Sequence, residues 1–109
     1  MPDQKVIGDF VMLPESTLLS KQWKNFTPST RIVFATMMLR YKRKGDDANG
    51  HVRWKQQELS DMAGLTRRTV INCIQDLVNA KWIHVEELGN KWGEGTEYYI
   101  EPEWANGKG

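Results

Sequence analysis

Residues 57–77 read QELSDMAGLTRRTVINCIQDL, and the spacing within this stretch decides the fold. Leu59 and Met62 fall on one face of a first helix, and Gly64 follows at a turn. A second helical pattern then occupies residues 67–80. Two helices joined by a tight turn that contains glycine form a helix-turn-helix, a geometry that can place the second helix in the major groove of DNA.

The second helix carries an apolar seam and, opposite it, a polar stripe. The seam repeats at positions i, i+3, i+4 and i+7, which predicts burial, and it consists of Val70, Cys73, Ile74 and Leu77. The stripe consists of side chains that can all donate hydrogen bonds: Arg68, Asn72, Gln75 and Asn79. Arginine pairs bidentately with guanine, and asparagine or glutamine with adenine, so the stripe is suited to reading bases.

Thr66 is predicted to cap the N-terminus of this helix. The free amides that follow favour a phosphate group, so Arg67 and Thr69 are candidate contacts to the DNA backbone. The alternative is that the polar stripe is simply the solvated face of an amphipathic helix, which is the common case. The glycine turn before the helix and the hairpin predicted after it favour the DNA interpretation.

The flanking sequence predicts an α+β fold. Thr27 and Pro28 mark the start of a core helix, which is predicted to run to about Lys44. Its broad apolar surface consists of Ile32, Val33, Phe34, Ala35, Thr36, Met37, Met38 and Leu39. The elements that follow are predicted helices over residues 56–63 and 67–80 and strands over residues 51–54, 82–86 and 96–100. The last two strands form a hairpin, and the whole is a winged helix-turn-helix: a three-helix core with a small antiparallel β-sheet and a hairpin wing.

The winged-helix domain is predicted to span residues 10–104. Residues 1–9 are expected to be a flexible N-terminus, and residues 105–109 a flexible tail that could link to a further domain. Residues 10–13 are interpreted as a strand or an extended arm. A short helix or turn is expected over residues 15–25, anchored by three apolar side chains: Leu18, Leu19 and Trp23.

Composition limits the function classes. The chain has 109 residues, enough for one small domain, and its net charge is +1. Residues 1–55 carry ten Lys or Arg against five Asp or Glu, and residues 56–109 carry five against nine, so phosphate contacts would come from local patches. A single cysteine, Cys73, excludes an intramolecular disulfide. No long apolar run predicts a membrane span, and we expect a cytoplasmic protein that does not bind a membrane.

Two charged regions lie outside the helix-turn-helix. A basic cluster at the end of the core helix either contacts phosphate or stabilises the helix C-terminus, and it consists of Arg40, Lys42, Arg43 and Lys44. In the hairpin loop, Lys91 beside Trp92 is the candidate contact. Four carboxylates surround them: Glu86, Glu87, Glu94 and Glu97. Because phosphates repel carboxylates, little wing contact beyond Lys91 is expected, and the acidic hairpin is alternatively a surface for another protein.

The sequence contains no pattern typical of catalysis. His51 and His84 are isolated, which excludes the usual spacing of zinc ligands, and no glycine-rich phosphate loop with its lysine is found. We therefore expect no enzyme activity, no metal and no cofactor. Trp54, Trp82 and Trp104 are interpreted as core and edge packing rather than as a stacking platform for single strands.

The segment LSDMAGLTRRTVINCIQDL, followed by KWIHVE, resembles bacterial winged-helix proteins with the pattern Leu-Ala-x-x-x-Gly-Val-Ser-x-x-Thr-Val. Over residues 10–102 the chain is most similar to the N-terminal DNA-binding domains of phage and plasmid replication initiators, including the phage lambda O type. The resemblance implies sequence-specific binding of double-stranded DNA at origin repeats, often as a dimer, through Arg67, Arg68, Thr69 and Asn72. The alternatives are the DNA-binding domain of a transcriptional regulator and a winged-helix module that binds proteins of a replisome.

Three positions depart from that pattern. Ser60 stands where alanine is usual, and Lys55 or Gln56 stands where a Ser or Thr cap is common. Lys81 occupies the usual position of a C-terminal glycine, where a left-handed backbone would be strained. The second helix is therefore expected to end differently, near Asn79.

Overall fold

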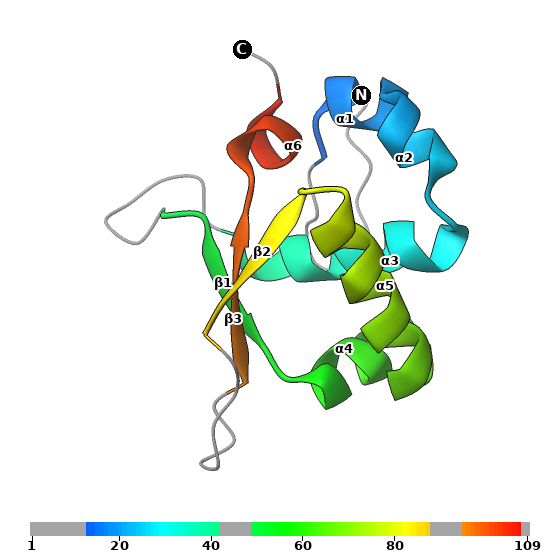
Figure 1. The fold of residues 1–109 in the computed structure, drawn as a ribbon, viewed down its shortest axis with the longest axis vertical. Coiled ribbons are helices and arrows are strands. Elements are labelled where there is room, and N and C mark those ends of the chain that lie inside the picture. Colours follow the sequence, from blue (N-terminus) through cyan, green and yellow to red (C-terminus); the bar gives the residue numbers. More distant parts are fainter. Residues whose placement is uncertain (1–12, 42–48, 88–94, 108–109) are drawn as a thin grey trace, which may run out of the picture.

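The computed structural model describes residues 13–41, 49–87 and 95–107 (Figure 1). In chain order the elements are α1 (Glu15–Leu19), α2 (Lys21–Asn25), α3 (Pro28–Met37), the 3-10 turn η1 (Met38–Arg40), β1 (His51–Trp54), α4 (Gln56–Ala63), α5 (Arg67–Asn79), β2 (Ile83–Glu87), β3 (Thr96–Ile100) and α6 (Pro102–Asn106). Both β1 and β2 pair antiparallel with β3, so the strand order is β1-β3-β2. Helices α3, α4 and α5 pack on one another beside this sheet. This is the predicted α+β winged helix-turn-helix.

Helix α3 begins at the predicted cap. The Thr27 hydroxyl accepts a hydrogen bond from the Thr30 amide over 3.2 Å, and proline occupies the first helical position. Most of the predicted apolar surface is buried, namely Val33, Phe34, Ala35, Thr36, Met37 and Met38. Leu39 is half-buried, but Ile32 is 44% exposed.

The predicted extension of α3 to Lys44 is wrong over its described part. The α-helix ends at Met37, the 3-10 turn η1 follows, and Tyr41 has an extended backbone. At the end of η1, the Arg40 guanidinium donates a hydrogen bond to a backbone carbonyl of β1 over 2.7 Å. Such contacts between distant parts of a chain override local helix propensity. Residues 42–48 lie outside the described residues.

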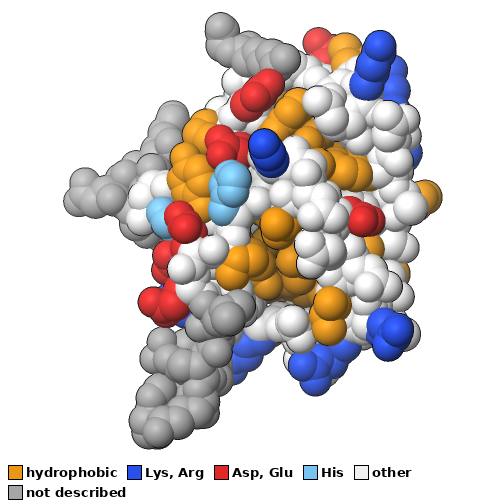
Figure 2. Space-filling view, in the orientation of Figure 1, with side chains coloured by type: hydrophobic (Ala, Val, Ile, Leu, Met, Phe, Trp, Pro, Cys, Tyr) orange, Lys and Arg blue, Asp and Glu red, His pale blue; other side chains and the backbone are white. Residues whose placement is uncertain are grey.

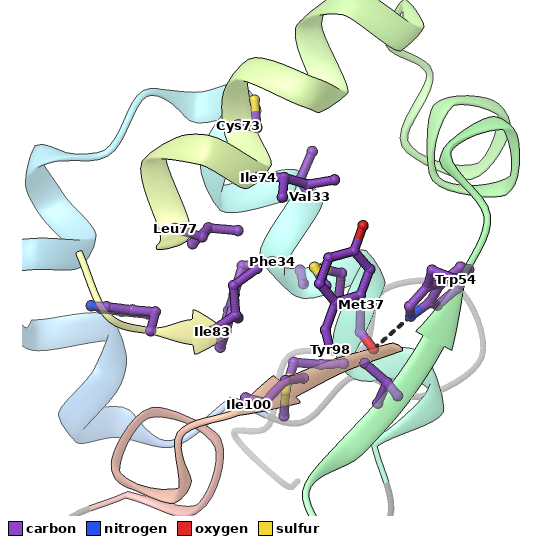
Figure 3. Packing of buried hydrophobic residues seen from close by; sticks show 14 of the residues in the cluster. Val33, Phe34, Met37, Trp54, Cys73, Ile74, Leu77, Ile83, Tyr98 and Ile100 are labelled. Carbon is purple, nitrogen blue, oxygen red and sulfur yellow. Dashed lines mark hydrogen bonds between the residues drawn. The ribbon is translucent and has the colours of Figure 1, made fainter. Parts of the chain in front are cut away.

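A hydrophobic core fills the space between α3, α5 and the sheet (Figure 3). Every member of the predicted α5 seam is buried: Val70, Cys73, Ile74 and Leu77. The Trp54 indole Nε1 donates to the Met37 carbonyl over 3.2 Å, which satisfies the polar atom of this ring. Trp82 stacks on Trp104 with ring centroids 4.2 Å apart. All three of these tryptophans are buried, which confirms their interpretation as packing residues.

The segment after Pro14 forms two short helices rather than one. Ser20 separates them and caps α2, its hydroxyl accepting from the Trp23 amide over 3.2 Å. The predicted anchor Leu19 is 62% exposed, because consecutive residues of an α-helix lie about 100° apart, so Leu18 and Leu19 do not face the same side. Thr17 is buried instead, and its hydroxyl donates to the Trp104 carbonyl over 2.7 Å. This bond joins the beginning of the described chain to α6.

Helix α6 is an element that the sequence patterns do not predict. Pro102 occupies its first turn, a position that favours proline. The helix continues to Asn106 and buries Ala105 completely, so the flexible tail predicted over residues 105–109 begins too early. The flexible N-terminus predicted over residues 1–9 and most of the predicted arm lie outside the described residues. Among the helices that the structure describes, none combines the length and the hydropathy that a bilayer crossing requires.

Candidate nucleic-acid interface

The turn between α4 and α5 is held by backbone and side-chain hydrogen bonds of one residue. Gly64 caps α4 with a left-handed backbone, φ 70°, which glycine adopts without strain. The Ser60 carbonyl accepts from the amides of Gly64 (3.0 Å) and Leu65 (3.1 Å), and the Ser60 hydroxyl donates to the Leu65 carbonyl. Ser60 is therefore more than a tolerated replacement for alanine, because its hydroxyl ties the turn to α4.

The N-terminus of α5 has the predicted cap. The Thr66 hydroxyl accepts from the Thr69 amide over 3.2 Å and donates to the Thr69 hydroxyl over 2.9 Å. Thr69 is thus engaged in the start of the helix, and its hydroxyl already accepts one hydrogen bond. In the middle of α5, Cys73 lies in the core, where burial raises the pKa of its thiol above the ordinary value. The exposed chemistry of α5 is therefore carried by the polar stripe and not by the cysteine.

All four stripe residues are exposed, and the structure divides them into two pairs. Arg68 and Asn72, in the first half of α5, form no hydrogen bond or ion pair with any described residue. Further along the helix, the Gln75 side-chain amide donates to the Asn79 side-chain oxygen over 3.1 Å. The first pair is available for a ligand as it stands. The side chains of the second pair already bond to each other, so a ligand would have to compete with that hydrogen bond or use their remaining donors and acceptors.

The helix starts of α4 and α5 meet at the same end of the molecule, at the lower edge of Figure 1. The Arg67 guanidinium donates to the Gln56 side-chain oxygen over 3.2 Å, and this bond links the first residues of the two helices. Lys55 precedes α4 and is exposed. Its weak cap is compensated, because the Glu58 carboxylate accepts from the Lys55 amide over 2.9 Å. Lys and Arg side chains gather along this lower edge in Figure 2.

One member of the predicted basic cluster has a structural role. The Arg40 guanidinium pairs bidentately with Glu58, at 2.9 and 3.2 Å, and lies 3.7 Å from the ring centroid of Trp54. Hydrogen bonds from Arg40 and from the Lys55 amide lower the pKa of Glu58 to about 2. Arg40 therefore fastens η1 to β1 and α4. Arg43 and Lys44 lie outside the described residues, as do Lys42 and the hairpin candidates Lys91 and Trp92, and all of them stay predictions.

The described base of the wing carries paired charges. The Arg53 guanidinium contacts Glu87 (3.0 Å) and Glu97 (3.1 Å) and also donates to the Gly95 carbonyl over 2.9 Å. Glu87, followed by Glu97, raises the pKa of Arg53 above its ordinary value. Glu86 is exposed. Acidic side chains gather over the sheet in Figure 2, so the predicted negative excess is present there, although Arg53 compensates part of it.

The part of the chain from within α3 to beyond β2 matches a known family in sequence. Residues 34–91, just over half of the chain, match the model of the Crp-like helix-turn-helix domain. This chain belongs to the Crp-like helix-turn-helix family. The matched span contains both helices of the motif, its turn and the polar stripe.

Solved structures share the fold of this Crp-like domain. The N-terminal domain of a DNA-binding protein is 16% identical over 86% of this chain and 75% of that one, with a TM-score of 0.61. A Rep–DNA complex gives the same identity, TM-score and share of this chain, with 76% of its own chain covered. An MDR initiator is 13% identical over 86% of this chain and 77% of that one, with a TM-score of 0.59. At such identities the likeness concerns the fold alone. It confirms that this chain has the fold of initiator N-terminal domains, as the resemblance implies. No curated protein sequence matches the chain significantly.

Three residues of this interface were not among the predicted contacts. Gln56 holds Arg67, which depends on a side-chain contact that sequence spacing does not encode. The sequence pattern marks Lys55 only as the position of a helix cap, although its charge lies beside the start of α4. Ile71 is 45% exposed on α5, and its signal was available, because Ile71 lies about 100° from the core direction of Val70 on a helical wheel.

Proposed function

We propose that this Crp-like domain binds double-stranded DNA in a sequence-specific manner, with α5 in the major groove. The observation that carries the proposal is the exposure of Arg68 and Asn72 on the first half of α5, without a hydrogen-bonding partner among the described residues. Arginine and asparagine are the side chains best suited to bidentate contacts with guanine and adenine. In helix-turn-helix proteins the N-terminal residues of the second helix contact base edges. The proposal is one of binding and not of catalysis.

The residues take different roles in this proposal. Arg68 and Asn72 read bases, and Arg67, held by Gln56, contacts a phosphate at the start of the helix. Thr69 supports the same phosphate position through the helix N-terminus that its own amide and hydroxyl help to cap. Gln75 and Asn79 lie further from the N-terminus and contribute as a hydrogen-bonded pair.

We further propose that the domain serves as the origin-binding domain of a phage or plasmid replication initiator. Support comes from the fold neighbours, which include a Rep–DNA complex and an initiator, and from the resemblance of residues 10–102 to initiator N-terminal domains. The DNA-binding domain of a transcriptional regulator is the alternative that shares every residue role given above. A recovered site with direct repeats would favour an initiator, whereas a single palindrome would favour a dimeric regulator.

The test is selection of bound duplexes from a random pool, followed by variants measured on the recovered site. Arg68→Ala is expected to weaken binding by about 1–3 kcal/mol and to relax the preference at one base pair, as is Asn72→Ala at a neighbouring one. Lys24→Ala is the control, because Lys24 is exposed on α2, away from the motif. Unchanged binding by both α5 variants would show that other residues read the bases.

A second candidate function is favoured by the acidic surface of the wing. Glu86 and Glu87 are exposed on β2, and such a surface suits a basic protein partner better than phosphate. Failure of the chain to bind any duplex at low salt, where phosphate contacts are strongest, would favour a replisome module that binds protein over the DNA-binding proposal.

A further inference from the structure

Helix α5 has one apolar side chain that the core does not explain. All residues of α5 are described, and within it Ile71 alone among the large hydrophobic residues is strongly exposed, at 45%. The neighbouring positions Val70 and Ile74 are 0% and 9% exposed, so the core seam is complete without Ile71. The exposed part of this side chain stays in contact with water after folding, so a ligand that covers it would gain the free energy of its burial.

The neighbours of Ile71 indicate what that ligand is. On a helix, residues three and four positions apart lie side by side. For Ile71 these are Arg67, Arg68, Ile74 and Gln75. Ile74 belongs to the buried seam, whereas the other three are exposed and able to donate hydrogen bonds. Ile71 also directly precedes Asn72. The apolar group therefore lies at the edge of the polar surface that, in the proposed function, faces the edges of base pairs.

We propose that Ile71 contacts the C5-methyl group of a thymine in the major groove, and this inference rests on the proposed DNA binding. The thymine methyl is the apolar group that the major groove presents, and it distinguishes a T·A pair from the other pairs there. Isoleucine in a helix has one strongly preferred χ1 rotamer, so little side-chain freedom is lost on contact. Ile71 thus specifies thymine beside the bases that Arg68 and Asn72 read.

A protein-docking surface is the competing explanation for an exposed isoleucine, and the surroundings of Ile71 disfavour it. Docking surfaces have a contiguous apolar centre and few charges there. Around Ile71 two guanidinium groups and an amide occupy three of the four adjacent helical positions, and the fourth, Ile74, is buried in the core. A contact with a single methyl group, flanked by polar contacts to neighbouring bases, fits this arrangement.

The experiment removes the methyl group from the DNA and the side chain from the protein separately. Each thymine of the recovered duplex is replaced singly by deoxyuridine, which lacks only the C5-methyl group. The full chain is expected to bind one of these duplexes about fourfold more weakly, as burial of a single methyl group predicts. Ile71→Ala is expected to bind the unmodified duplex more weakly by a similar or larger factor, and to be insensitive to deoxyuridine at that same position.

Two further variants distinguish loss of the contact between Ile71 and thymine from a general effect of removing an isoleucine from the fold. Ile71→Val keeps a β-branched side chain and should keep most of the discrimination between thymine and deoxyuridine. Ile32→Ala removes an isoleucine of similar exposure from α3 and should leave that discrimination intact. If the parent chain binds the duplex but Ile71→Ala retains full sensitivity to every deoxyuridine, Ile71 does not read thymine, and DNA binding itself stands. If the parent chain binds no duplex at any salt concentration, the proposed function and this inference both fail.

Discussion

Glu58 shows how one ion pair affects stability with pH. Its pKa is lowered from 4.5 to about 2, chiefly by the hydrogen bonds from Arg40, so the folded state favours the charged carboxylate. The stabilisation is therefore present above about pH 4.5 and is lost as the pH falls towards 2. The pair is 42% and 37% exposed, so solvent screening limits its contribution to about 1 kcal/mol. Glu58→Gln should lower the free energy of unfolding by this amount at neutral pH and by much less near pH 2.

Urea unfolding at a series of pH values measures this difference. The control is the same substitution in an Arg40→Ala background, where Glu58→Gln should have a smaller pH-dependent effect because only the hydrogen bond from the Lys55 amide remains. A difference between Glu58→Gln and the parent that is equal at neutral and acidic pH would show that the ion pair does not stabilise the fold.

Lys81 is the other residue whose local energetics can be tested. It has a left-handed backbone, φ 63°, directly after the C-cap Ala80. The helix ends at Asn79, as expected, but the reason given for that expectation is wrong, because Lys81 adopts the left-handed backbone instead of avoiding it. The Trp82 amide closes the turn by donating to the Leu77 carbonyl over 3.0 Å. A left-handed residue other than glycine costs about 1–2 kcal/mol. Lys81→Gly should therefore raise the free energy of unfolding by up to about 1 kcal/mol, after the greater freedom of glycine in the unfolded chain is included.

Lys81→Ala is the matched comparison for that prediction, because it removes the same side chain but keeps the Cβ atom that causes the strain. Thermal or urea unfolding should rank Lys81→Gly above both the parent and Lys81→Ala. Equal midpoints for the two variants would mean that the turn relaxes the left-handed backbone without cost.

At the scale of whole elements, the sequence predicts those features that depend on residues close together in the chain. The starts of α3 and α5 follow from Thr27 and Thr66, whose hydroxyls accept from amides three residues later in the same chain segment. The α5 seam follows from the helical period alone. The end of α3 and the existence of α6 could not be predicted in this way. Arg40 bonds to residues of β1 and α4, and Ala105 is buried by a packing arrangement that involves α1.

In the candidate interface, too, some features follow from the local sequence and others depend on packing between distant segments. Exposure of Arg68 and Asn72 follows from helical periodicity and was predicted. The bond from Arg67 to Gln56 depends on the packing of α4 against α5, which only the folded structure supplies. Ile71 was missed for a different reason, since an isoleucine next to a buried seam is ordinarily assigned to it. Its offset of about 100° from Val70 on the helical wheel nevertheless indicates exposure, and the side chain is 45% exposed.

At the scale of the whole molecule, a net charge of +1 conceals an uneven distribution. In Figure 1 the helix starts of α4 and α5, with Lys55, Arg67 and Arg68, lie at the lower edge, and α1 and α2 lie at the upper right. In Figure 2 the acidic side chains gather over the sheet. If the lower edge meets the DNA backbone, only charges located there should release counterions from the phosphates.

The salt dependence of duplex binding tests this orientation. Each phosphate contact contributes about 0.9 to the slope of log K against log salt concentration, so Lys55→Ala should reduce the magnitude of the slope by about that amount. Lys21→Ala removes the same charge from α2, at the opposite end of the molecule, and should leave the slope unchanged. The two lysines carry equal charge and both are exposed, so a general effect of net charge would lower both slopes alike. A reduction for Lys21→Ala and none for Lys55→Ala would mean that the DNA lies at the α1–α2 end, and the assignment of α5 to the major groove would then be wrong.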